Sequence, residues 1–200
     1  MKFIRKSIPL IAVLAVTTIF TNPTLANGYR DASKPAIVAK SAMTVTPPRA
    51  WNALSVRPGK NAEIWTLDGE MLNNVTFFGN IGAGSPLYRE RSKRREPLPK
   101  MRKDTLLVDL PELLEGTIRA YNGIAIFSVT DSNPAKFLGR DGIRFSYQYT
   151  DNDQLPRLGE ATGTIIDGKL YMASFEAPRL HYFGAALEDY RALVSSAKMK

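Results

Sequence analysis

The sequence predicts an α+β fold, with a mostly antiparallel sheet of about six to seven strands packed with two helices in an α/β/α sandwich-like arrangement. Three observations lead to this prediction. Asp-Gly pairs at 68–69 and 167–168 each separate two strand-like segments, and this dipeptide favours two-residue hairpin turns. Two segments, around 110–121 and 183–197, repeat apolar residues at helical spacing. Short connections between the strand-like segments favour antiparallel pairing.

The first 26 residues have the pattern of a secretory signal peptide. The cations Lys2, Arg5 and Lys6 precede an apolar run at 8–20, and small residues follow up to Ala26. That run is too short for an uncleaved membrane anchor, which needs roughly 20 apolar residues. Cleavage after Ala26 leaves 174 residues and lowers the net charge from +8 to +5. We therefore expect a periplasmic or secreted protein with no transmembrane segment in the mature chain.

The composition limits the chemistry of the mature chain. The chain has no cysteine, which excludes disulfides, thiolate metal ligands, a cysteine nucleophile and a lipid anchor on cysteine. Residues 27–41 show neither strand nor helix periodicity and are predicted to form a flexible leader. Residues 42–200 contain no internal repeat and no change in amino-acid composition that would mark a domain boundary. The length of this region is typical of one domain, so a single α+β domain is predicted.

Strand and helix patterns alternate along that domain. Strands are predicted at 43–46, 63–67 and 75–78, the last an edge strand followed by a flexible glycine-rich bend at 79–84. A helix follows with Asp109 as its N-cap, Pro111 in its first turn and Gly123 at its end. Four more strands are predicted at 124–129, 143–149, 162–166 and 169–176, with a polar turn at 151–153. A final helix carries an apolar stripe, with Lys198 and Lys200 at its negative carboxyl end.

Two stretches of this pattern resemble the PsbP/Mog1-type α/β/α sandwich. The first is the hairpin around Trp65-Thr66-Leu67-Asp68-Gly69. The second runs from Gly168-Lys169-Leu170-Tyr171-Met172 through the helix ending in Ala192-Leu193-Val194-Ser195-Ser196. The resemblance covers roughly residues 43–198. It implies an antiparallel sheet between helices and an accessory or assembly role without enzymatic activity, and it implies no particular site residue.

No catalytic, cofactor-binding or metal-binding residue is predicted. His181 is the only histidine and has no serine nucleophile in a G-x-S-x-G pattern, so we expect it to pack or cap at the entry of the last helix. The glycine run at 79–84 lacks the lysine of a phosphate loop, since Ser85 stands at that place. The calcium-loop-like start at 151–153 is followed by Pro156 where the loop requires glycine.

A basic segment is the strongest functional signal in the sequence. Its eight cations stand against Glu90 and Glu96, which gives a local charge of +6, more than that of the whole mature chain. These cations, the predicted partner-binding residues, are Arg89, Arg91, Lys93, Arg94, Arg95, Lys100, Arg102 and Lys103. Concentrated charge of this kind attracts anionic partners. The alternative is a solvated loop that only maintains solubility.

Three hypotheses about function remain open at this point. The leading one is an exported, non-enzymatic envelope protein that binds or helps assemble an anionic protein, lipid headgroup or polysaccharide; nucleic acid is not expected in that compartment. The second is a carrier of a small apolar or sugar ligand, with a sheet-face pocket lined by Trp51, Trp65, Phe77, Phe78, Phe145, Tyr147, Tyr149 and Tyr171. The third, a carboxylate-dependent envelope hydrolase, requires two acids to converge in one cleft.

Overall fold

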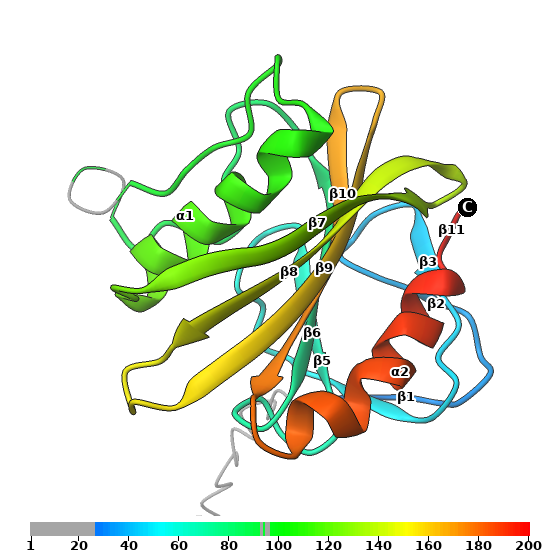
Figure 1. Cartoon of the computed structure of the whole chain (residues 1–200). Helices are drawn as coiled ribbons and strands as arrows, with labels where there is room; N and C mark the ends of the chain where they lie inside the picture. Colours follow the sequence, from blue (N-terminus) through cyan, green and yellow to red (C-terminus); the bar gives the residue numbers. More distant parts are fainter. Residues whose placement is uncertain (1–26, 93, 95–96) are drawn as a thin grey trace, which may run out of the picture.

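The computed structural model describes residues 27–92, 94 and 97–200, and within them two α-helices pack on a large antiparallel sheet (Figure 1). Eight strands lie in the order β1-β4-β5-β6-β10-β9-β8-β7, and a second sheet has the order β11-β3-β2. The predicted α+β class is confirmed, and the main sheet is slightly larger than predicted. The predicted signal peptide, residues 1–26, lies outside the described residues.

The elements have the following bounds. The large sheet contains β1 (Gly28–Arg30), β4 (Trp51–Ala53), β5 (Ala62–Thr66), β6 (Asn74–Ile81), β10 (Lys169–Pro178), β9 (Pro156–Ile166), β8 (Arg140–Thr150) and β7 (Phe127–Phe137). The small sheet contains β2 (Ala36–Ile37), β3 (Met43–Val45) and β11 (Lys198–Met199). The helices are the 3-10 helix η1 (Leu107–Asp109), α1 (Leu110–Asn122) and α2 (Tyr182–Ser195).

Side-chain alternation along β10 shows how the layers are arranged. Ala173 and Phe175 belong to a core that contains α2 and the small sheet, whereas Leu170 and Met172 belong to a second core that contains α1. Because successive strand residues point to opposite faces, α1 and α2 lie on opposite sides of the large sheet. The structure is thus an α/β/α sandwich, with the small sheet on the α2 side (Figure 1).

The predicted helices are present with nearly the predicted ends. Helix α1 begins after Asp109 and ends at Gly123, whose φ of 69° is the left-handed conformation that glycine adopts without strain. The Asp109 carboxylate does not cap α1, because its Oδ2 accepts the Leu106 amide at 2.8 Å instead. Helix α2 buries Tyr190 and packs the rest of its predicted apolar stripe against the same core.

The carboxyl end of the chain differs from the prediction. Lys198 does not extend the end of α2, because the chain turns after Ser196 and residues 198–199 form β11 beside β3. The Lys200 amide donates to the Ala42 carbonyl at 2.8 Å. Strand pairing with a segment more than 150 residues away in sequence therefore replaces the expected contact with the helix end.

Residues 27–41 contain strands where the sequence predicts a flexible leader. Strand β1 pairs with β4, β2 pairs with β3, and Val38 and Ala39 are fully buried. The segment has no periodicity of its own because each strand is only two or three residues long. Residues 27–41 are held in place by strands that are distant in sequence, and a local sequence pattern does not show such pairing.

Two of the remaining strands also differ from their predicted form. Strand β6 is central, between β5 and β10, and includes Gly79, so it is not the predicted edge strand. Gly79 is required there because a Cβ would lie 2.4 Å from Ser41 Oγ. Strand β7 continues to Phe137 through a polar, largely exposed stretch, which the sequence does not mark as a strand because an edge strand needs no apolar alternation. The predicted turn at 151–153 is confirmed between β8 and β9.

Candidate functional site

The predicted basic segment is closed at its base. The Gly84 amide donates to the Met101 carbonyl at 2.8 Å, and the Met101 amide donates to the Ser85 carbonyl at 3.1 Å. Leu87, Leu98 and Met101 are buried at this base. The chain therefore leaves the end of β6 and returns to the same place, so the described part of the segment is anchored to the fold.

A nearly buried acid, Glu90, stabilises the inner side of the basic segment. The Glu90 side chain is 5% exposed, lies 3.4 Å from Lys100 Nζ and accepts the Leu98 amide at 3.2 Å. The Arg89 amide donates to the Pro58 carbonyl at 2.7 Å, which ties the segment to the loop before β5. Glu90 thus pairs with one of the predicted binding cations and, through the Leu98 amide, holds the returning part of the segment in place.

The structure separates the six predicted binding cations that it describes. Arg89 and Lys100 line one pocket, whereas the Arg91 guanidinium lies 4.5 Å above the Tyr121 ring and lines another. Arg102 pairs with Asp104 at 3.0 Å. Arg94 and Lys103 are exposed, and Lys93 and Arg95 lie outside the described residues. The charge is therefore divided among several surfaces.

The pocket lined by Arg89 and Lys100 also contains Lys60, and we call it the basic pocket. It has a volume of about 470 Å³, and its other described lining residues are Asn61, Asn80, Ile81, Gly84, Ser85, Pro86, Tyr88 and Glu90. Among these, Glu90 is the one acid, and it is paired with Lys100. Lys60 and Arg89 form no ion pair with another described residue. Two cations without an ion-pair partner among the described residues, beside amide and hydroxyl groups, make an anion-binding arrangement.

Lys60 was not predicted as a site residue, because it lies 29 positions before Arg89 in the sequence. Lys60 and Arg89 are brought together because the loop before β5 approaches the base of the basic segment. A Cβ on Gly59 would lie 2.6 Å from the Leu87 carbonyl oxygen, so glycine at 59 lets the loop before β5 contact the base of the segment. The sequence signal was only a Pro-Gly pair, which indicates a turn but not its partner.

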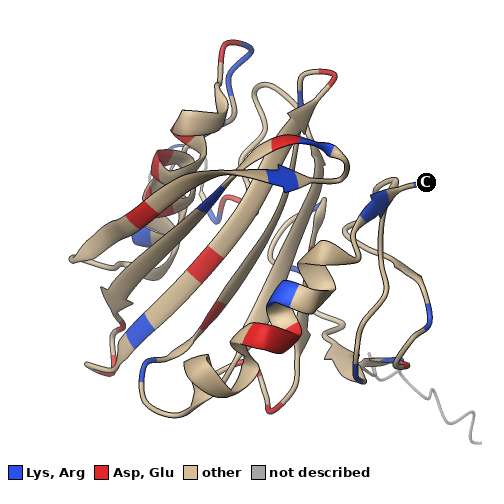
Figure 2. Ribbon diagram, turned by 45° about the vertical axis from the view of Figure 1, so that its right-hand side comes forward, with Lys and Arg blue, Asp and Glu red and all other residues tan. Residues whose placement is uncertain are grey.

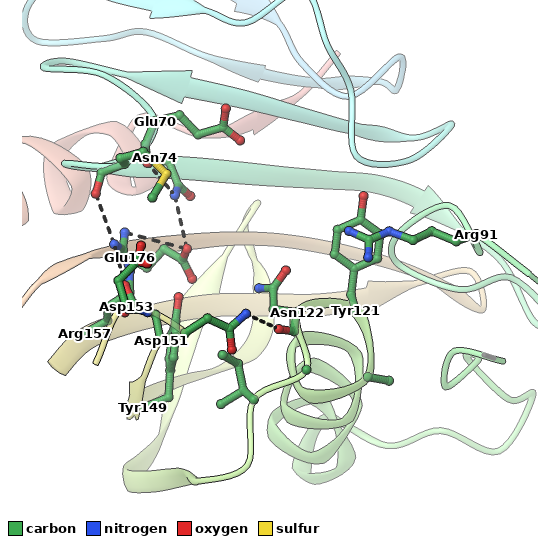
Figure 3. A pocket seen from close by; sticks show the side chains of 15 residues that line it. Glu70, Asn74, Arg91, Tyr121, Asn122, Tyr149, Asp151, Asp153, Arg157 and Glu176 are labelled. Atoms are coloured by element: carbon green, nitrogen blue, oxygen red, sulfur yellow. Dashed lines mark hydrogen bonds and ion pairs between the residues drawn. The ribbon is translucent and has the colours of Figure 1, made fainter. Parts of the chain in front are cut away.

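A larger cavity, of about 540 Å³, lies beside the end of α1, and we call it the acidic cleft (Figure 3). Its lining includes four acids, Glu70, Asp151, Asp153 and Glu176, together with Arg91 and Arg157. The convergence of acids required by the hydrolase hypothesis is therefore present. Burial and the charge of Glu176 raise the pKa of the Tyr149 phenol in the same wall.

The inner carboxylates of the acidic cleft have structural partners. Arg157 Nη1 donates to the Met71 carbonyl at 3.0 Å and lies 3.6 Å from Asp151 Oδ2, and Nη2 lies 4.0 Å from Glu176 (Figure 3). Asp151 Oδ1 accepts the Leu155 amide at 2.9 Å and so closes the β8–β9 turn. These acids hold a buried guanidinium and a hairpin in place, which accounts for their proximity without catalysis.

The aromatic residues expected to line a sheet-face pocket are core residues. All eight are at most 6% exposed and belong to the two cores on either side of the large sheet. Of these eight, Tyr149 reaches the wall of the acidic cleft. The aromatic groove of the carrier hypothesis is thus filled by the packing of the sheet against its helices.

The other residues that the sequence raised as possible site residues form no catalytic or metal-binding arrangement among the described residues. His181 is exposed, with a φ of 67°, and makes no side-chain cap bond, so the expected packing or capping role is replaced by an edge contact with the Tyr182 ring. Within residues 27–92, 94 and 97–200, no three His, Cys, Asp or Glu side chains are grouped to hold a metal ion. No helix in this part of the chain is long and apolar enough to cross a membrane.

The fold is that of known structures at low sequence identity. The solution structure of cyanobacterial PsbP (CyanoP) from Synechocystis sp. matches with a TM-score of 0.54 and 12% identity, covering 95% of this chain and 99% of that one. The Ran-binding protein Mog1p of Saccharomyces cerevisiae matches with a TM-score of 0.47 and 8% identity, covering 88% and 96%. No family model and no curated protein sequence matches the chain. The predicted resemblance to the PsbP/Mog1-like fold is confirmed at the level of the fold.

Proposed function

We propose that the protein is an exported, non-enzymatic envelope protein that binds or helps to assemble an anionic partner through the basic segment 89–103 and Lys60. One observation carries this proposal: Lys60 and Arg89 converge on the basic pocket and form no ion pair with another described residue. Cations kept apart from acids retain their charge for a partner, whereas paired surface cations contribute little to recognition.

The rigid base of the segment supports a binding role over that of a solvated loop. Backbone bonds at Gly84 and Met101, together with the Glu90 contacts, fix Arg89 and Lys100 before a partner arrives. Prepositioned groups lose less conformational freedom on binding. Export rests on the signal pattern of residues 1–26 and places the protein in the periplasm or outside the cell.

The test is a cross-linked pull-down from envelope extracts at low and high salt. Lys60→Glu/Arg89→Glu is compared with Arg140→Glu/Arg144→Glu, which makes the same change in net charge on exposed residues of β8. We expect a defined partner that is lost at high salt and in the first variant but retained in the second. Equal recovery by both variants and the unaltered protein would overturn the proposal and leave the segment as a solvated surface.

A further inference from the structure

A short, rigid projection lies between the basic segment and α1, and we call residues 102–108 the tip. The Arg102 amide donates to Thr105 Oγ1 at 2.8 Å, and the Leu106 amide donates to Asp109 Oδ2 at 2.8 Å. The Asp109 amide returns a bond to the Leu106 carbonyl at 3.1 Å. Two consecutive turns therefore fix the backbone of the tip, which projects beyond the start of α1 (Figure 1).

The tip presents two large apolar side chains to solvent. Leu106 is 62% exposed and Val108 is 71% exposed, whereas Leu107 between them packs against the core that contains α1. The alternation means that burying Leu107 leaves its two neighbours outside. Single exposed apolar residues are normal, but two on one rigid turn form a surface that water solvates poorly.

Basic residues precede this apolar pair in the chain, and others lie at the same end of the large sheet. Lys100, Arg102 and Lys103 precede it directly, and the Gly84–Met101 bond joins the base of the tip to the loop that lines the basic pocket. Pairing of Leu170 with Ile81 brings the β9–β10 turn, with Lys169, to the same end of the sheet. Figure 2 shows both basic and acidic residues on the loops that project there.

Acids also lie at this end and offset much of that charge. Glu90 is paired with Lys100, Asp104 is paired with Arg102, and Asp167 lies in the β9–β10 turn. Asp109 and Glu112 lie at the start of α1 and share a pocket with Arg102. Lys60, Arg89, Lys103 and Lys169 form no ion pair with another described residue. The end of the molecule therefore combines an exposed apolar pair at its tip with four cations that have no ion-pair partner among the described residues.

We infer that the anionic partner is a lipid bilayer surface, which the protein contacts with Leu106 and Val108 at the headgroup–acyl boundary and with the surrounding cations on the headgroups. This inference rests on the proposed function, since it names the partner of the same basic surface. An acidic bilayer fits both features at once, because it offers negative charge outside and apolar chains below. A soluble polyanion accounts for the cations but leaves the exposed apolar pair without a role.

The test is cosedimentation of protein recovered from a periplasmic extract with vesicles of phosphatidylcholine, with or without phosphatidylglycerol. We expect binding only to the anionic vesicles. Leu106→Ser/Val108→Ser should weaken it by about tenfold, and Lys103→Glu should weaken it by about fivefold. Ile126→Ser/Leu180→Ser alters residues that are at least as exposed, at 73% and 82%, but lie at the other end of the sheet, and it should bind normally.

A second measurement does not depend on the double variants folding. Because the chain has no cysteine, Leu106→Cys introduces a single attachment point for an environment-sensitive fluorophore. Its emission should shift to the blue on anionic vesicles, whereas the same label on Leu180→Cys should not respond.

Absence of vesicle binding, or unchanged binding by the tip variant, would overturn the inference. If the pull-down still recovers a partner that depends on Lys60 and Arg89, the proposed function stands and its partner is a polysaccharide or an acidic protein. If neither experiment shows binding, both proposals fail.

Discussion

Arg30 Nη2 lies 3.3 Å from Glu63 Oε1, so an ion pair joins β1 to the interior of β5. The Glu63 side chain is 3% exposed and also contacts Arg57 at 2.9 Å, Trp65 Nε1 at 2.9 Å and the Ala39 amide at 3.2 Å. One carboxylate therefore binds three separate parts of the chain. Its contacts give the physical reason that residues 27–41 are ordered instead of forming a leader.

Glu63→Gln should lower the free energy of unfolding by about 2–4 kcal/mol, because two arginines lose their counter-charge in a mostly buried position. Chemical denaturation followed by circular dichroism measures this loss. Glu188→Gln serves as the control, since Glu188 also pairs with an arginine but is 83% exposed, and its loss should cost less than about 0.5 kcal/mol. Equal effects of the two substitutions would contradict the role given to Glu63.

Gly159→Ala should strongly destabilise the fold. A Cβ at this position of β9 would lie 2.0 Å from Tyr147 Cζ, and the neighbouring ring atoms are nearly as close. Overpacking of this kind costs about 1–3 kcal/mol or more. In a Tyr147→Leu background the cost should be smaller, and a double-mutant cycle of unfolding free energies tests this coupling. Additive effects would mean that the ring does not cause the penalty.

Alkaline pH should unfold the protein through its buried tyrosines. Burial raises the pKa of the Tyr88, Tyr147, Tyr149 and Tyr190 phenols above the ordinary value of 10, and the charge of Glu176 adds to the effect for the first three. The native state therefore keeps protons that the unfolded state loses above about pH 10. Stability should be unaffected by these groups below that pH and fall above it, by about 1.4 kcal/mol per pH unit for each tyrosine.

Urea denaturation at several pH values on either side of 10 measures that slope. Tyr149→Phe should reduce it, whereas Tyr29→Phe, which removes a phenol that is 65% exposed, should leave it unchanged. A slope that Tyr149→Phe does not alter would show that other groups control alkaline unfolding.

Glu90→Ala should loosen the basic segment without unfolding the domain. The substitution removes the acceptor of the Leu98 amide and the partner of Lys100. Local opening should become about tenfold more frequent, which corresponds to the loss of one hydrogen bond to a charged group. The rate of trypsin cleavage after Arg91 or Arg94 reports this opening. Glu115→Ala, which removes an ion pair on α1, should cleave at the original rate.

Protein isolated from the periplasm or the culture medium should begin at Asn27. Cleavage after Ala26 follows from the basic start, the short apolar run and the small residues before the cut. Intact-mass spectrometry distinguishes residues 27–200 from the full chain. Recovery of the full-length chain in the membrane fraction would instead indicate an uncleaved anchor.

Several features of the fold were readable from the sequence because their signals are local. The Asp-Gly pair at 167–168 joins β9 and β10 as predicted, and Gly123 ends α1 because that conformation suits glycine. The alternation at 143–149 gave β8 with its aromatic side chains buried. Each of these predictions depends on residues a few positions apart.

The basic segment was also readable as a concentration of charge, but its arrangement was not. Whether Lys100 is free or paired depends on Glu90, and the position of the Arg91 guanidinium depends on the Tyr121 ring. The sequence contains all four residues but not their distances. Hence the eight predicted cations form one group in the sequence, whereas the six that the structure describes lie in several separate environments.

The sequence by itself determined the fold class, the two helices, the β9–β10 hairpin and the presence of a basic segment, because hydrogen bonding and burial within short stretches impose those patterns. The two-residue turn predicted at Asp68-Gly69 is wrong, since residues 67–73 form a longer connection between β5 and β6. Only the tertiary structure decided that Lys60 lies beside Arg89, that Lys198 pairs with Thr44 and that Glu63 holds Arg30. These pairs are brought together by the order of strands in the two sheets and by loop contacts such as that of Gly59 with Leu87. Such proximity results from the packing of the whole chain, so no local pattern encodes it.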